Sequence, residues 1–181
     1  MLVYVLYMNS DSFSPTAPLP EAGFHYLDHI TDVIIEAFGT TLEEAFINSA
    51  KGLVNTMFDI NYPHKEQLAF NLRELEIEAK GYDYNSLLYD WLEKVLLIVL
   101  VDRILVSSFN VKILSSISPN AKIPNNDDQS FCAFYLEAVA RGEPISLDRH
   151  EYKVEVKAIT YHGMEVKQEN DRFVTKFLVD L

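Results

Sequence analysis

The sequence has one cysteine, few basic residues and no long apolar run, and each shortage narrows the possible classes of protein. Cys132 is the only cysteine in 181 residues, so the chain cannot form an internal disulfide. Its apolar surroundings, Phe131–Phe134, are typical of a buried structural thiol. Because cytosolic thiols are kept reduced, this cysteine usage favours an intracellular protein of the cytoplasm or the nucleus.

The apolar segments are too short to cross a bilayer or to direct secretion. Val95–Val101 is bounded by Lys94 and Asp102 and falls well short of the ~20 residues that a spanning helix needs. Met1–Met8 is apolar but lacks the basic residues that begin a secretory signal. We therefore expect no association with a membrane.

Positive charge is scarce. Lys and Arg number 15 against 27 Asp and Glu, which gives a formal net charge of -12. Phosphate-driven binding of nucleic acid requires a basic surface, so strong direct binding to RNA or DNA is not expected. The charge favours a basic protein partner, a bound cation, or solubility alone. The glycine-rich and nucleophile motifs of common enzyme families are also missing.

The length and the local composition predict one domain preceded by a leader. Residues 1–23 include a stretch rich in Ser, Pro and Ala, and we expect them to form a flexible N-terminal leader. Residues 24–181 are long enough to bury a core without disulfides or structural metals. We expect this part to form a single folded domain.

Hydrophobic periodicity predicts an α+β fold, with two helices packed on largely antiparallel sheet. Thr40 with Glu43, or Thr41 with Glu44, forms a capping box for the first helix. Asp83 or Ser86 is expected to cap the second helix. A turn at His162-Gly163 is expected to separate two strands. The predicted strands are 32–38, 68–79, 109–117, 131–141, 152–158, one beginning at 164, and 172–180, and the second helix is predicted over 84–106.

Two places in the sequence suggest metal ligands on chemical grounds. The strand 172–180 runs up to Asp180-Leu181, where a carboxylate, a carbonyl and the terminal carboxylate come together. Hard cations such as Ca²⁺ and Mg²⁺ prefer such oxygen clusters. His29 and Asp32 are separated by two residues, a spacing that two metal ligands can have, although Asp32 is also typical of a turn. The other histidines are His25, His64, His150 and His162.

Five segments in order resemble the archease family. They are Phe24–Val33, which matches an opening His-Thr-Ala-Asp motif; Gly39–Phe46; Gly81–Asp83 with Leu87-Leu88 and Trp91-Leu92; Gly142–Pro144 with Val156–His162; and the ending Val179-Asp180-Leu181. The resemblance covers residues 24–181. Its departure is Ile30-Thr31, where the family has Thr-Ala, so the hydroxyl is displaced by one residue.

The resemblance implies a non-catalytic activator of the GTP-dependent RtcB-type RNA ligase of tRNA splicing. Archeases promote guanylylation of that ligase and allow it to turn over repeatedly. By position, the family's divalent-cation ligands are Asp32, Asp180 and Leu181, and the cation is taken to be Ca²⁺. Two other readings stay open: a metal-dependent enzyme that uses Asp28, His29 and Asp32, and a metal-stabilised, chaperone-like binding module.

Overall fold

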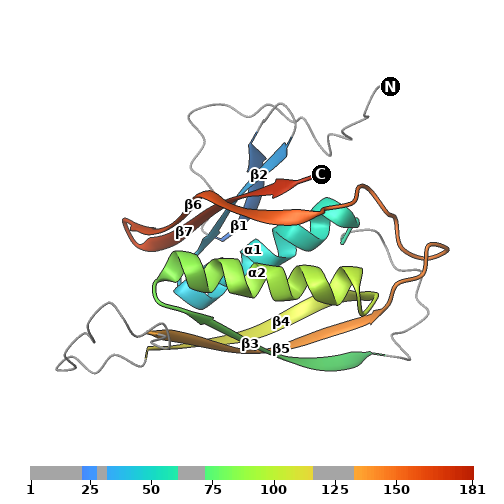
Figure 1. Ribbon diagram of the computed structural model, residues 1–181, viewed down its shortest axis with the longest axis horizontal. Coiled ribbons are helices and arrows are strands. Elements are labelled where there is room, and N and C mark those ends of the chain that lie inside the picture. Colours follow the sequence, from blue (N-terminus) through green and yellow to red (C-terminus); the bar gives the residue numbers. More distant parts are fainter. Residues whose placement is uncertain (1–21, 28–31, 61–71, 116–132) are drawn as a thin grey trace.

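Two helices lie between two antiparallel sheets in the computed structural model (Figure 1). The structure describes residues 22–27, 32–60, 72–115 and 133–181. In chain order the elements are β1 (Gly23–Leu27), β2 (Asp32–Gly39), α1 (Leu42–Met57), β3 (Arg73–Gly81), α2 (Tyr84–Leu100), β4 (Ile104–Ser115), β5 (Phe134–Pro144), β6 (Ala158–Glu169) and β7 (Arg172–Asp180). The predicted α+β class is confirmed.

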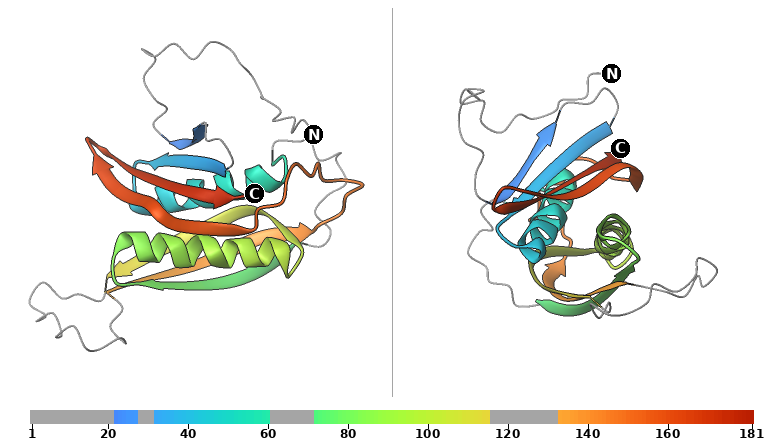
Figure 2. Two further views of the ribbon diagram at one scale, coloured as in Figure 1. Left: turned by 45° about the horizontal axis from the view of Figure 1, so that its top comes forward. Right: turned by 90° about the vertical axis from the view of Figure 1, so that its left-hand side faces the viewer.

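Each sheet joins strands that are distant in the sequence. The four-stranded sheet has the order β1-β2-β7-β6, and the three-stranded sheet has the order β3-β5-β4. Every strand pair is antiparallel. Figure 2 shows one sheet on each side of the helix pair. As a result, each sheet buries its inner face against α1 and α2 and leaves its outer face uncovered by them.

The core forms where the apolar faces of the helices meet the two sheets. Trp91 of α2 is fully buried, and its indole N–H donates to the Phe46 carbonyl of α1 at 3.0 Å. The indole ring also makes an edge-on contact with Phe109 of β4, with ring centroids 5.5 Å apart. Burying a side chain of this size contributes roughly 2–3 kcal/mol. Trp91 therefore connects both helices with the three-stranded sheet.

Both helices begin at the caps that the sequence predicts. Thr41 is the N-cap of α1 and accepts a hydrogen bond from the Glu44 amide at 3.1 Å. The Glu44 carboxylate reaches back to the Thr40 amide at 2.7 Å, one residue earlier than in a standard capping box. Asp83 and Ser86 form a capping box on α2. A Cβ at Gly39 would collide with the Ala45 backbone, which explains the glycine before α1.

The predicted end of the second helix is wrong. The sequence predicts that the helix covers residues 84–106, but it stops at Leu100. Residues 104–106 instead begin β4. Arg103 has a φ of 57°, a left-handed conformation that reverses the chain. Ile104, Leu105 and Val106 are all buried. A continuous apolar run cannot distinguish a buried helix from a buried strand, and this explains the error.

Two further predictions in the last third of the chain are wrong. Residues 153–157 belong to no strand, and Tyr152 makes only an isolated bridge to Phe58. The turn expected at His162-Gly163 is instead a register shift within β6, where Gly163 has a φ of 73°. The actual hairpin turn follows β6, with Asn170 at a φ of 53°. The short strand β1, at the start of the predicted domain, was not predicted.

Candidate metal centre

The paired ends of β2 and β7 bring Asp32 and Asp180 together. Asp32 lies directly opposite Asp180 in the antiparallel register. Directly opposed residues project from the same face of a sheet, with Cβ atoms about 5 Å apart. Asp32 is half-buried and Asp180 is exposed, whereas the preceding Val179 is fully buried. The pairing of two strands from opposite ends of the chain thus places both carboxylates at one rim of the sheet.

The third predicted ligand, Leu181, follows Asp180 at the same rim. Its side chain packs against the hydrophobic core, which restrains the main chain at this point. The Lys157 ammonium donates to the Leu181 main-chain oxygen at 2.6 Å, and the Lys157 amide donates to the Asp180 carbonyl at 2.9 Å. No role for Lys157 was predicted, because side-chain contacts between distant segments leave no periodic signal in the sequence.

The chemistry of these donors fits a hard divalent cation. Asp32 and Asp180 supply carboxylate oxygens, and Leu181 supplies main-chain oxygen, which are the ligand types that Ca²⁺ prefers. Within the described ranges, no three or more His, Cys, Asp and Glu side chains are grouped so that they could hold a metal ion. Main-chain oxygen must therefore complete any site built on these two carboxylates. A cation there would share the Leu181 oxygen with Lys157 or displace its ammonium.

A polar network fixes β1 and the end of α1. The Tyr26 hydroxyl donates to the Gly52 carbonyl at 3.2 Å and accepts from the Asn55 side chain at 2.8 Å. Burial raises the pKa of Tyr26. The Lys153 ammonium donates to the Asn55 carbonyl at 3.1 Å, which satisfies one of the last carbonyl groups of the helix. This network holds β1 in place immediately before residues 28–31.

Most of the histidines in the described residues have structural partners. His25 lies 3.2 Å from the Glu36 carboxylate in the neighbouring strand. His150 has a buried ring that accepts from the Ser146 amide at 3.0 Å and lies 3.2 Å from Glu143. His162 is exposed. His29, His64, Asp28 and Cys132 lie outside the described residues, and so do the displaced hydroxyl of Thr31 and most of the leader.

Glu143 is a carboxylate with a structural role that the sequence did not indicate. It bonds His150 and also pairs with Arg149 at 2.8 Å, so it braces the segment after β5. Burial by itself would raise the pKa of Glu143. The hydrogen bonds from His150 and Arg149 outweigh that effect and hold the pKa below its usual value.

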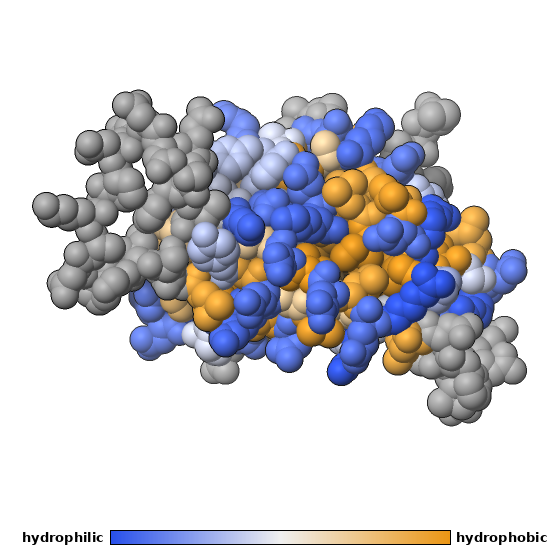
Figure 3. Space-filling model, turned by 60° about the horizontal axis from the view of Figure 1, so that its bottom comes forward, coloured by the Kyte–Doolittle hydropathy of each residue, from blue (hydrophilic) through white to orange (hydrophobic). Residues whose placement is uncertain are grey.

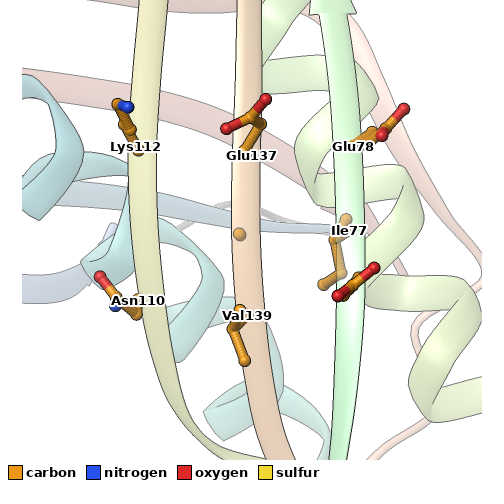
Figure 4. A pocket seen from close by; sticks show the side chains of 8 residues that line it. Ile77, Glu78, Asn110, Lys112, Glu137 and Val139 are labelled. Carbon is orange, nitrogen blue, oxygen red and sulfur yellow. The ribbon is translucent and has the colours of Figure 1, made fainter.

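A concave surface lies on the outer face of the three-stranded sheet. It is a shallow hollow of about 410 Å³. In Figure 4, Lys112, Glu137 and Glu78 form one row across β4, β5 and β3, and Asn110 and Val139 begin the next row. Figure 3 shows hydrophilic and hydrophobic residues interleaved over this side of the molecule. The hollow therefore lacks a converging set of ligands.

Comparison with known proteins identifies the family. The model of the archease protein family matches residues 24–181. The chain belongs to the archease family. The archease of Methanopyrus kandleri is 34% identical over 155 residues, covering 86% of this chain and 96% of that protein. The archease of Pyrococcus abyssi is 34% identical over 158 residues, covering 87% of this chain and 96% of its own length.

A solved structure also resembles this archease. The solution structure of protein 1598 from Methanobacterium thermoautotrophicum is 33% identical and covers 88% of this chain and 99% of its own. Its TM-score is 0.60. The family resemblance seen in the five sequence segments is thus confirmed, and the matched region includes Asp32 and Asp180. None of the helices in the described parts of this archease is long and apolar enough to span a membrane.

Proposed function

We propose that this chain activates the GTP-dependent RtcB-type RNA ligase of tRNA splicing, through a divalent-cation site at the rim of its four-stranded sheet. One observation carries the proposal: Asp32 and Asp180 are direct cross-strand partners in a chain that belongs to the archease family. The activity that the proposal assigns is promotion of ligase guanylylation and of repeated turnover. The chain itself is not the catalyst.

The residues of the rim are suited to hold a cation rather than to carry out chemistry. Asp32, Asp180 and Leu181 would bind it, with Ca²⁺ as the expected ion. When bound, the ion would supply a fixed positive charge at the rim of a chain whose net charge is -12. Because both carboxylates extend from paired strands, their separation is set by the sheet and not by a flexible loop.

The net charge supports a protein partner over RNA. A charge of -12 repels phosphate and is attracted to the basic surface that an RNA-binding enzyme presents. The Lys157 ammonium donates to the Leu181 main-chain oxygen, so a cation bound there would share that oxygen with Lys157 or displace its ammonium. The rim would then carry one set of contacts with the cation and another without it.

The test is a pull-down with the cognate ligase followed by a guanylylation assay with and without this chain. We expect wild-type protein with Ca²⁺ to bind the ligase and to raise the rate of guanylylation. Glu78→Ala, which removes a carboxylate from the outer face of the other sheet, is the matched control and should stimulate fully. Failure of the wild-type chain to bind or stimulate the ligase would refute the proposal. Turnover of a small substrate by the chain alone would favour the metal-dependent enzyme.

A further inference from the structure

Three tyrosines from three elements converge at the N-terminal end of α2. Tyr82 comes from the turn before the helix, Tyr89 from α2 itself and Tyr161 from the edge strand β6. The hydroxyls of Tyr82 and Tyr161 lie 3.4 Å apart. The rings of Tyr89 and Tyr161 make an edge-on contact, with centroids 5.6 Å apart and planes at 69°. We call these three residues the tyrosine cluster.

Two of the three rings are too exposed to be explained by the core, although Tyr89 packs against it. Tyr82 is 65% exposed and Tyr161 is 43% exposed. A single exposed aromatic residue needs no explanation. Here, however, a turn, a helix and a strand each contribute one ring to the same place. Tyrosine is enriched at the energetic centres of protein interfaces, because its ring is large, rigid and tipped by a polar group.

The surroundings of the cluster are negative. The hydrogen bond with Tyr82, burial and the nearby carboxylate of Asp83 raise the pKa of Tyr161 to about 12. Burial and the carboxylate of Glu93 raise the pKa of Tyr89. Both phenols are therefore neutral at physiological pH and present uncharged ring faces. Glu93 is exposed one helical turn beyond Tyr89, so that a carboxylate borders the rings.

We propose that the tyrosine cluster receives an arginine side chain of a basic protein partner. A guanidinium group stacks on aromatic faces and pairs with a carboxylate at the same time, which the rings and Glu93 offer together. Lysine stacks on aromatic rings less well than arginine, because its charge is compact and strongly hydrated. A nucleobase could also stack on the rings, but its phosphates would meet Asp83, Glu93 and the -12 charge of the chain.

The position of the cluster in the fold suggests which partner binds it. Tyr161 lies three residues along β6 from Ala158, which is paired with Asp180 of the candidate metal centre. At about 3.3 Å per residue, this separates the two sites by roughly 10 Å along the strand. Tyr161 projects toward α2, where its ring meets Tyr89, whereas Asp180 projects from the opposite face of the sheet. Because β6 is an edge strand, a partner that reaches around this edge can contact both sites. If the proposed function holds, that partner is the ligase, and the cluster is a second part of its docking surface.

The ring–cation contacts made elsewhere in the described residues supply a control. Tyr135 on the outer face of the three-stranded sheet already has the Lys80 ammonium 5.9 Å from its ring centre. Tyr135→Leu removes a ring of the same type from the other sheet. Tyr161→Phe removes the hydroxyl of the cluster but keeps the ring, whereas Tyr161→Leu and Tyr82→Leu remove a ring but keep an apolar side chain.

The first measurement is the affinity of the purified ligase for each variant, using only variants that melt at the same temperature as the wild type. We expect Tyr82→Leu and Tyr161→Leu to weaken binding by about 5- to 30-fold, the range that one or two ring–cation contacts give. Glu93→Gln should weaken it by about 3-fold, and Tyr161→Phe and Tyr135→Leu should leave it unchanged. Equal binding by wild type and both leucine variants would overturn the inference while leaving the proposed function standing.

The second measurement does not depend on the ligase. Ring signals of the tyrosines are followed by NMR during titration with N-acetyl-arginine amide, the matching lysine compound and a short single-stranded oligonucleotide. We expect saturable shifts at Tyr82 and Tyr161 with the arginine compound, weaker ones with lysine, and none at Tyr135. Shifts caused by the oligonucleotide alone would overturn the inference in favour of base stacking. Arginine-specific shifts in a chain that does not bind the ligase would support this site and refute the proposed partner.

Discussion

The two sheets of this archease carry their carboxylates in different ways. At the rim of the four-stranded sheet, Asp32 and Asp180 meet at the ends of paired strands, beside Leu181 and Lys157. On the outer face of the three-stranded sheet, Glu78 and Glu137 are also direct cross-strand partners. However, they lie in mid-strand, and Lys112 is opposite Glu137 on its other side.

The comparison shows that pairing alone does not make a cation site. Mid-strand carboxylates face solvent, and their main-chain oxygens are occupied by the sheet ladder. At the rim, the Leu181 main-chain oxygen lies beyond the last pair of the ladder and is bonded by the Lys157 ammonium, which a cation could displace. The rim can therefore offer a mixed set of oxygen ligands, which Ca²⁺ requires, whereas the outer face offers only side chains. The predictions below test this difference.

Loss of Asp32 should have the largest effect. Asp32→Ala should lower Ca²⁺ affinity by at least about 100-fold, since even the outer partners of metal ligands are worth about 10- to 100-fold. Stimulation of the ligase should be lost with it, while the circular dichroism spectrum stays that of the wild type. Glu78→Ala should change neither quantity. An Asp32→Ala protein that stimulates guanylylation fully would remove Asp32 from the site.

Changes at the end of β7 should come next. A tag fused after Leu181 would crowd the rim, so we expect it to lower Ca²⁺ affinity about 10-fold or more. An N-terminal tag should have no effect, because the predicted leader lies outside the family match. Calorimetric titration of the two tagged proteins checks this. Equal affinities would show that Leu181 takes no part.

Substitution of Glu143 tests the comparison further. Glu143 is a carboxylate of the three-stranded sheet, and we expect its loss to lower stability and not cation binding. Glu143→Ala should lower the free energy of unfolding by about 2 kcal/mol, since it removes the acceptor of the buried His150 ring. Glu143→Gln should cost less because it keeps an acceptor. Urea unfolding measures both. A Glu143→Ala protein as stable as the wild type would contradict this role, and neither variant should alter Ca²⁺ affinity.

The lowered pKa of Glu143 also fixes the direction of a pH effect. Its stabilising contribution is complete above the unfolded-state pKa of about 4.3 and disappears as the pH falls through the lower folded-state value. The difference in stability between wild type and Glu143→Gln should therefore narrow on acidification below about pH 4. Unfolding curves across this range provide the check, and a constant difference would argue against the ion pair.

Salt concentration should have the smallest effect on ligase binding, because it screens the charges of both sheets alike. The -12 charge should steer the chain to a basic partner, so the association rate with the ligase should fall several-fold between low salt and about 0.3 M. The dissociation rate should change less. Surface plasmon resonance separates the two rates. Tight, salt-sensitive binding to free tRNA would instead contradict the picture of an acidic activator.

Much of the fold could be predicted because its signals are local. Strands β2 and β7 and the starts of both helices follow from alternation and from capping residues such as Thr41 and Asp83. The end of α2 could not be predicted, because the apolar run into Ile104 has no periodicity that separates helix from strand. Residues 153–157 alternate as a strand would, yet the structure pairs them only at isolated hydrogen bonds.

The candidate site was only partly predictable for the same reason. The family resemblance selected Asp32, Asp180 and Leu181, but only the β2–β7 register shows that two of them are neighbours. Lys157, Glu143 and the tyrosine cluster were not assigned roles. Their contacts join segments that are far apart in the chain or depend on side-chain geometry, and neither leaves a pattern along the sequence.

The central claim is that Asp32 and Asp180 share one cation, and a calorimetric double-mutant cycle tests it most directly. Ca²⁺ is titrated into wild type, Asp32→Asn, Asp180→Asn and the double variant, with Glu78→Gln/Glu137→Gln as a control of equal charge. We predict one binding event in the wild type and the control, the loss of that event in each single variant, and no further loss in the double variant. Titrations of the single variants that match the wild type, or two separate events of which each variant loses one, would contradict a shared site.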